Sequence, residues 1–207
     1  MGHAMPPSPP TIEISIASRG ISKGLSQTRG PQAVVRAELP IGPIYVAAYA
    51  KNVTSTTADG EGGLVAGIRT KVAGLNVSVS AAWRIAISPG AGTDNQSLEL
   101  AGSVARKFGH FTPQLAVTWS PDDLGSTRRS LYYEASATYG ITTRTSIGAA
   151  VGRRERTGGQ DYTAFNVGIT HKLNPHVTAD LRYYGSNTHN LGYTYQPGVA
   201  ASLRMKF

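Results

Sequence analysis

Basic side chains spaced two residues apart are the groups in this 207-residue chain whose type and spacing best suit binding chemistry. Arg69 with Lys71, and Arg204 with Lys206, show this spacing. Guanidinium and ammonium groups bind carboxylates and phosphates, and the chain carries a formal net charge of +8. The sequence therefore predicts anionic partners, provided that the fold gathers these cations on one surface.

β-Strands are the elements expected to gather them, because apolar and polar residues alternate through most of the chain. Ile12, Ile14 and Ile16, for example, alternate with Glu13 and Ser15. No helical period persists over a long window. We expect twelve strands, at residues 11–20, 31–40, 44–53, 63–73, 75–87, 96–108, 111–120, 128–141, 144–154, 161–173, 176–185 and 193–207.

The connections between these segments alternate between two kinds. Tight turns are expected at residues 41–43, 73–74, 109–110, 142–143 and 174–175. Longer polar loops are expected at residues 21–30, 54–62, 88–95, 121–127, 155–160 and 186–192. An even strand count with short turns at one end indicates an all-β fold: a closed antiparallel transmembrane β-barrel with short periplasmic turns and longer extracellular loops. Closure pairs every strand edge inside the bilayer.

Alternation alone does not show which face of the strands meets water, since a soluble β-protein would bury the apolar face. Three features favour a membrane barrel with that face outward. No charge interrupts the middle of a clearly phased apolar stripe, and the polar face includes small residues such as Gly148 and Ala150 that suit a crowded lumen. Aromatic residues also lie near strand ends, as in interfacial girdles. These are Trp83, Trp119, Tyr133 and Tyr183 toward the long loops, and Tyr139 and Phe207 toward the short turns.

Several function classes are excluded or disfavoured by composition and spacing. No run of about 18 uncharged apolar residues is present, which excludes helical membrane spans. The absence of cysteine excludes disulfides, thiol catalysis and cysteine-ligated zinc. The five histidines show neither metal-ligand spacing nor a nucleophile in phase with one of them, so we expect no metal, no cofactor and no catalytic residue. The basic loops lack interleaved aromatic residues, which disfavours nucleic acid.

Three short stretches resemble bacterial outer-membrane proteins. Residues 202–207, which end in Phe207, resemble the terminal strand of Gram-negative outer-membrane proteins. Residues 17–22 and 45–53 are similar to strands of an uncharacterised proteobacterial outer-membrane family. The resemblance implies an outer-membrane location, contact with the lipid bilayer and lipopolysaccharide, and recognition of Phe207 by the barrel assembly machinery. It implies no catalytic residues.

Strand phase assigns a set of side chains to the predicted lumen, with an excess of six positive charges. Lys51 is left out because the third strand cannot be phased. Tyr132 and Tyr184 share the inward phase, where they either stack a planar solute or pack in the rim. The inward acidic residues are Glu13, Glu38, Glu99, Glu134 and Asp180. The inward basic residues are Arg19, Arg36, Arg69, Lys71, Arg84, Lys107, Arg154, Lys172, Arg182, Arg204 and Lys206.

Residues 1–10 are interpreted as a cloning remnant and a proline-rich leader, and residues 11–207 as one barrel domain whose export signal has been removed. Twelve tilted strands give a backbone cylinder roughly 24 Å across with a central gap of about 10 Å. The leading hypothesis is an outer-membrane channel for small, anionic solutes. The alternatives are a plugged structural or adhesion barrel whose loops bind a partner, and a soluble all-β binding protein.

Overall fold

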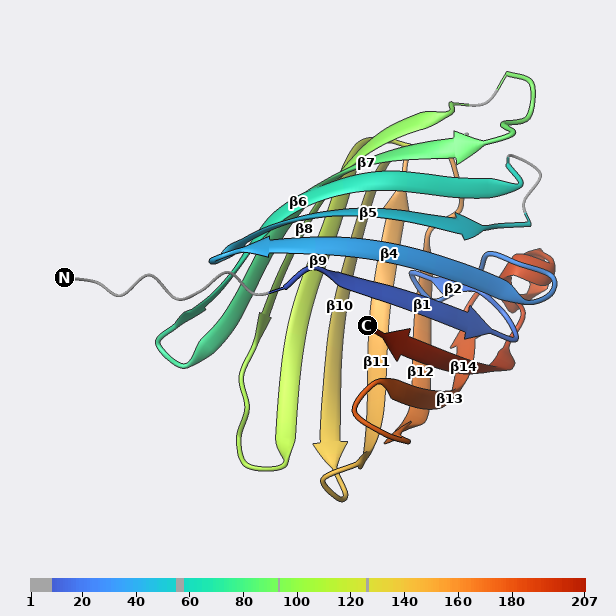
Figure 1. The fold of residues 1–207 in the computed structure, drawn as a ribbon. Helices are drawn as coiled ribbons and strands as arrows, with labels where there is room; N and C mark the ends of the chain where they lie inside the picture. The colour runs from blue at the N-terminus through green and yellow to red at the C-terminus, as the bar shows by residue number, and fades with distance from the viewer. Residues whose placement is uncertain (1–8, 55–57, 93, 126) are drawn as a thin grey trace.

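Alternating residues give each long strand one apolar and one polar face, and the strands join edge to edge into a ring. The structure is a computed structural model that describes residues 9–54, 58–92, 94–125 and 127–207 (Figure 1).

Most of the expected leader, residues 1–8, lies outside the described residues. The elements are β1 (Thr11–Ala17), β2 (Ile21–Ser22), β3 (Leu25–Ser26), β4 (Gln32–Ile41), β5 (Ile44–Asn52), β6 (Gly60–Val72), β7 (Leu75–Ile87), β8 (Gln96–Ala105), β9 (Phe111–Asp123), β10 (Arg128–Gly140), β11 (Thr145–Arg156), β12 (Tyr162–Lys172), β13 (Val177–Ser186), the 3₁₀ helices η1 (His189–Leu191) and η2 (Tyr193–Tyr195), and β14 (Gly198–Lys206).

Twelve of these strands form a closed antiparallel barrel, which confirms the predicted fold class. The ring runs β1, β14, β13, β12, β11, β10, β9, β8, β7, β6, β5, β4 and back to β1. Pairing of β1 with β14, with Glu13 opposite Lys206, closes it. β1 begins and β14 ends at the short-turn rim, where Ile12 and Phe207 exchange backbone hydrogen bonds of 3.0 and 2.9 Å. No helix in the described part of the chain is long and apolar enough to cross a membrane.

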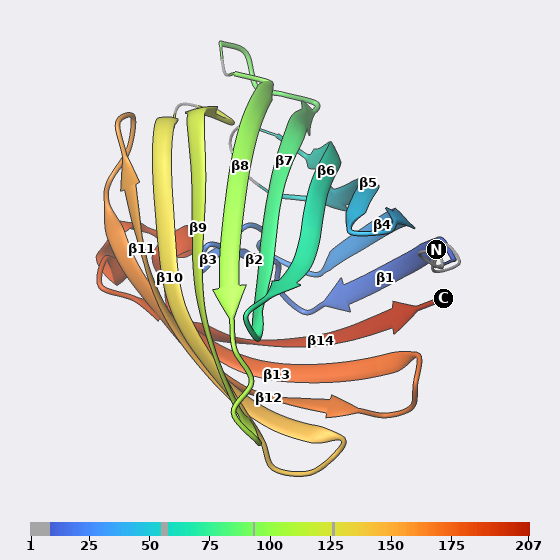
Figure 2. The same ribbon diagram turned by 90° about the vertical axis from the view of Figure 1, so that its left-hand side faces the viewer.

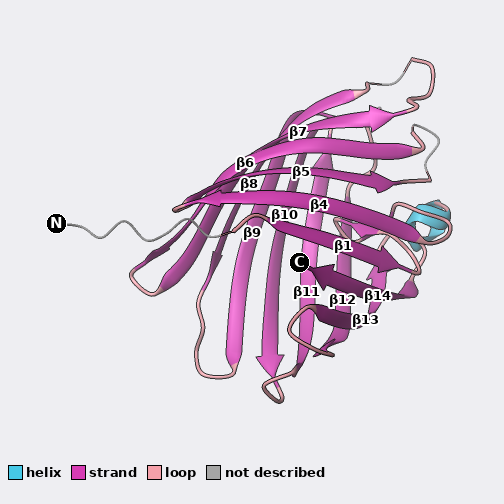
Figure 3. Ribbon diagram, viewed as in Figure 1, coloured by secondary structure: helices cyan, strands magenta, loops and turns pink. Residues whose placement is uncertain are grey.

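Several predicted boundaries are wrong. The first strand ends at Ala17 rather than residue 20, and the last begins at Gly198 rather than 193, because the chain before it forms the 3₁₀ helices seen in cyan in Figure 3. β6 begins at Gly60 and β9 continues to Asp123, so both reach further into the long-loop end than expected. Residues 21–30, expected to be a polar loop, contain the β2–β3 hairpin.

The outward face of the barrel is apolar. Val79, Leu115 and Val167 expose 58%, 60% and 53% of their surface. The six aromatic residues of the predicted girdles are exposed as well. A soluble barrel would bury such side chains. The interpretation as a soluble β-protein is therefore wrong.

The β2–β3 hairpin lies inside the ring. Figure 2 looks into the barrel and shows β2 and β3 surrounded by barrel strands. Leu25 of β3 is buried with Tyr162 and Ala164 of β12, which form a small apolar core. The lumen is thus partly filled by the chain's own first long loop.

Candidate functional site

Strand phase places charged side chains inside the barrel. Arg84 of β7 is only 8% exposed, whereas its neighbours Trp83 and Ile85 are 50% and 43% exposed. The same alternation gives an inward phase to the residues predicted for the lumen, although Arg19 and Lys107 lie just beyond the ends of β1 and β8. The lumen is therefore the candidate functional site, and the role of these residues in solute binding stays a prediction.

Arg84 is the centre of a group of charged side chains in the long-loop half of the lumen. Its guanidinium reaches Glu61 at 3.0 Å, Glu99 at 3.0 Å and Asp123 at 2.8 Å. Because the arginine fork donates up to five hydrogen bonds, one residue satisfies carboxylates from three strands. We call the whole group the ion-pair cluster: Lys23, Lys51, Glu61, Arg84, Glu99, Asp123 and Arg154.

The ion-pair cluster contains four residues that the sequence analysis did not assign to the lumen. Lys51 lies 3.4 Å from Glu61, so β5 does turn this lysine inward. Lys23 lies on the hairpin and Asp123 at the extended end of β9. These additions bring two cations and two anions. The predicted excess of six positive charges is therefore unchanged, while its distribution differs.

The short-turn half of the lumen is different. Arg36 and Arg69 bind Glu38 at 2.9 and 2.6 Å, and Arg204 lies 3.5 Å from Glu13. No described carboxylate lies within 4.0 Å of the other inward cations near this rim. These unpaired cations, which we call the rim lysines, are Lys71, Lys107, Lys172 and Lys206.

The remaining predicted lumen residues lie in the wall or at the long-loop end. Arg182 donates to Asp180 at 3.0 Å and to Asn166 at 2.8 Å. Arg19 donates to Ser26 at 2.6 Å, and its guanidinium lies 4.7 Å from the centre of the Tyr193 ring. The guanidinium of Arg19 is thus bound to residues of the long loops and does not point freely into the lumen.

Tyr132 packs in the wall rather than standing free in the lumen. It is 8% exposed, and its hydroxyl donates to Glu134 at 2.7 Å. A Cβ on the facing Gly152 would lie 2.2 Å from the Tyr132 hydroxyl, so only glycine leaves room for the ring. Of the two predicted roles for Tyr132, the geometry favours packing. Tyr184 is half-buried in β13.

A cavity of about 440 Å³ lies between the hairpin and the part of the barrel wall formed by β4–β8. A second cavity, of about 170 Å³, lies nearer the long loops. Gln27, Glu61 and Arg84 line both cavities and therefore lie at the boundary between them.

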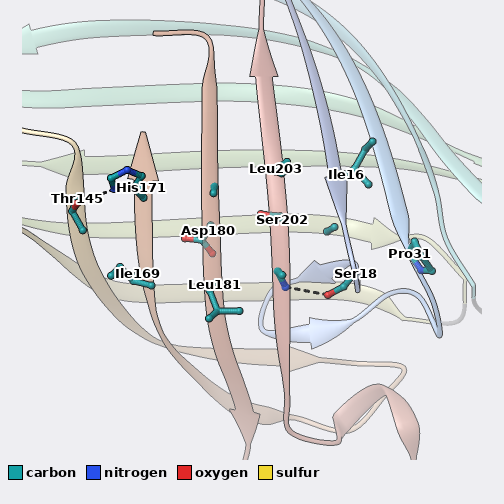
Figure 4. A pocket seen from close by; sticks show the side chains of 13 residues that line it. Ile16, Ser18, Pro31, Thr145, Ile169, His171, Asp180, Leu181, Ser202 and Leu203 are labelled. Carbon is teal, nitrogen blue, oxygen red and sulfur yellow. Dashed lines mark hydrogen bonds between the residues drawn. The ribbon is translucent and has the colours of Figure 1, made fainter. Parts of the chain in front are cut away.

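An apolar hollow of about 670 Å³ lies on the outer wall instead, where β1, β12, β13 and β14 meet (Figure 4). Ile16, Leu181 and Leu203 line it, and Thr145 and His171 form a 2.9 Å hydrogen bond at one end. This is the lipid-facing side, and it presents no charged cluster to a solute.

The comparison with protein families identifies this barrel. The model of the Gram-negative porin family matches residues 13–191. The chain belongs to the Gram-negative porin family. This porin is an outer-membrane β-barrel, with its long loops at the cell exterior and its short turns in the periplasm. It is a porin-like outer-membrane channel.

Solved structures share the fold of this porin at low sequence identity. The KdgM porin in complex with disordered oligogalacturonate has a TM-score of 0.67 at 9% identity, with 95% of this chain and 99% of that chain covered. An outer membrane channel from Pseudomonas putida F1 has a TM-score of 0.62 at 12% identity, with 98% and 96% covered. The NanC porin has a TM-score of 0.60 at 7% identity, with 94% and 97% covered. No curated protein sequence matches the chain.

Proposed function

We propose that this porin conducts small solutes passively and favours anions. The observation that carries the proposal is that the inward carboxylates have partners whereas the excess cations do not. Within the described residues, Glu134 accepts from the Tyr132 hydroxyl, and the other inward carboxylates lie within 4.0 Å of a basic side chain. The rim lysines face water, so the free charge in the lumen is positive. Low-dielectric walls strengthen the attraction of anions to such charge.

The KdgM porin gives independent support, because its structure was determined in complex with oligogalacturonate, a chain of sugar carboxylates. Guanidinium and ammonium groups are the natural partners of carboxylates. We extend the proposal to small carboxylated or phosphorylated solutes as a class. We assign no catalytic role to the chain.

Reversal-potential measurements in planar bilayers under a KCl gradient test the proposal. The wild-type porin is expected to give the sign of an anion-selective pore. Replacing all four rim lysines with glutamine is expected to bring the chloride-to-potassium permeability ratio close to 1. The matched control replaces Arg106 and Arg144, which lie near the same rim, with glutamine and is expected to retain most of the selectivity. A cation-selective wild-type pore would overturn the proposal.

A plugged barrel whose loops bind a partner is the second candidate, and the hairpin inside the lumen favours it. A wild-type protein without conductance, and with partner binding that depends on the long loops, would support this candidate against the first. In either case we propose that lipopolysaccharide phosphates contact exposed residues at the long-loop end of β10, such as Arg128 and Arg129. We also propose that the assembly machinery reads Phe207, which is 66% exposed.

A further inference from the structure

The β2–β3 hairpin lies against β12 inside the lumen and carries a lysine side chain that contacts the opposite wall. It leaves the wall between β1 and β4, which are neighbours in the ring. Its tip residue Lys23 lies 2.5 Å from Glu99 of β8 and 3.6 Å from Asp123 of β9. In this ring of twelve strands, β9 is six places from β1 and is therefore diametrically opposite. The Lys23 ammonium thus links the hairpin to the wall opposite the strands from which the hairpin starts.

The backbone of the tip is a tight turn that directs Lys23 toward this far wall. Lys23 and Gly24 have φ of 50° and 77°, the pair of positive values that a two-residue type I′ hairpin requires. A lysine in this left-handed region is unfavourable unless its surroundings hold it there. The hydroxyl of Tyr162 supplies such a contact by donating to the Lys23 carbonyl at 2.8 Å.

The base of the hairpin is fixed separately from its tip. The Gly20 amide donates to Thr28 Oγ1 at 2.8 Å, and Lys51 donates to the Gln27 side chain at 2.9 Å. Thr28 is 1% exposed. Neither hydrogen bond involves Lys23, and the one from Lys51 ties the base to β5. A substitution at Lys23 therefore removes tip contacts only.

The hairpin closes one side of the lumen and leaves the other open. On the β12 side, Leu25 packs on Tyr162 and Ala164. A Cβ on Gly24 would lie 2.3 Å from that of Ala164, so there is no gap at this contact. On the β4–β8 side, the 440 Å³ cavity separates the hairpin from the wall, and Ser22, Lys23 and Gln27 line it.

We propose that Lys23 determines the size limit of the channel, because its ion pairs with Glu99 and Asp123 hold the hairpin across the lumen and confine solutes to the β4–β8 side. The inference rests on the proposed channel function but not on anion selectivity. Neutralising Lys23 leaves both carboxylates paired, since Arg84 binds each of them and Arg154 also binds Asp123. A change in pore size then reports on the hairpin rather than on collapse of the ion-pair cluster.

A cysteine at position 23 tests the proposal, since the chain contains no other cysteine. We expect Lys23→Cys to raise the single-channel conductance about twofold, because a released hairpin opens the β12 side of the lumen and conductance follows the open cross-section. Larger polyethylene glycols should then enter the pore. Modification with methanethiosulfonate ethylammonium, which restores an ammonium at this position, should return both values to those of the wild type, whereas the sulfonate analogue should not.

Arg106→Cys, treated with the same reagents, is the control for a charge away from the hairpin, and its polyethylene glycol cut-off should not change. A shift in the electrophoretic mobility of each variant on boiling establishes that the unboiled protein is folded. An unchanged conductance and cut-off in folded Lys23→Cys would overturn the proposal, as would equal effects of the two reagents. The reversal potential is measured on the same channels, so a cation-selective pore that enlarges in Lys23→Cys would contradict anion preference alone.

Discussion

The two halves of the lumen carry similar residue types in different arrangements. In the long-loop half, the ion-pair cluster joins four cations to three carboxylates, and Arg84 at its centre is buried. In the short-turn half, the rim lysines have no described carboxylate within 4.0 Å and are exposed. The first arrangement fixes structure, and the second leaves charge available to ions. Net lumen charge is therefore a poor guide to function unless paired and unpaired groups are separated.

Removing Arg84 should have the largest effect on stability. Arg84→Met leaves Glu61 with Lys51 and the Tyr49 hydroxyl, and removes a partner from Glu99 and Asp123. Breaking a buried ion pair from one side costs about 3 kcal/mol or more. Urea unfolding in detergent micelles measures the free energy of unfolding. Arg69→Met, at a side chain that is 52% exposed, is the control and should cost less than about 1 kcal/mol. Equal losses would contradict the distinction between the halves.

Truncating Tyr162 should loosen the hairpin tip without replacing a charged residue, while the Lys23 ion pairs remain. Tyr162→Ala removes the apolar seat of Leu25 and the hydrogen bond to the Lys23 carbonyl. Large-to-small core substitutions cost about 3 kcal/mol, which corresponds to about a hundredfold more of the open form. Trypsin cleavage after Lys23 should accelerate accordingly. Tyr139→Ala, on the lipid-facing wall, should leave the cleavage rate unchanged, and an equal acceleration there would indicate general loosening.

Salt should weaken the selectivity of the channel. The Debye length falls from about 10 Å at 0.1 M to about 3 Å at 1 M ionic strength, so the exposed rim lysines act on passing ions over a shorter distance. The chloride-to-potassium permeability ratio, measured at a fixed gradient over rising mean KCl concentration, is expected to fall toward 1. In the variant that lacks the rim lysines, little salt dependence should remain; a dependence as steep as in the wild type would assign the selectivity to other charges.

The smallest effect is expected at the exposed pair of Arg204 and Glu13. The Arg204 side chain is 64% exposed and the two groups are 3.5 Å apart. Exposed pairs of this kind contribute less than about 0.5 kcal/mol in many measurements. Arg204→Gln should therefore change the free energy of unfolding by no more than that. A loss comparable to that of Arg84→Met would show that the rim is structurally important after all.

The barrel was predictable because lipid contact imposes a two-residue period on every spanning strand. The phase of β5 could not be predicted, since its outward residues near Lys51 are Ala48 and Ala50, which are too small to mark the apolar face. Asp123 was missed because Pro121 suggests a turn, yet β9 continues past it.

The position of Lys23 inside the lumen could not be predicted from the residues near it in the sequence. Its partners Glu99 and Asp123 lie 76 and 100 positions later in the chain, and nothing in residues 21–30 alone indicates that they turn inward. Strand alternation predicts which residues face the lumen, but the path of a loop depends on contacts that form only in three dimensions.

The hydrogen bond between Tyr162 and Lys23 joins positions 139 residues apart, and this separation bears on the order of biogenesis. Contacts between distant segments form late, because the intervening chain must first be arranged. The N-terminal hairpin is synthesised early, yet its seat on β12 exists only once most of the barrel has been laid down. A nascent barrel would therefore be most permeable just before completion, when the ring has almost formed and its internal obstruction has not yet docked.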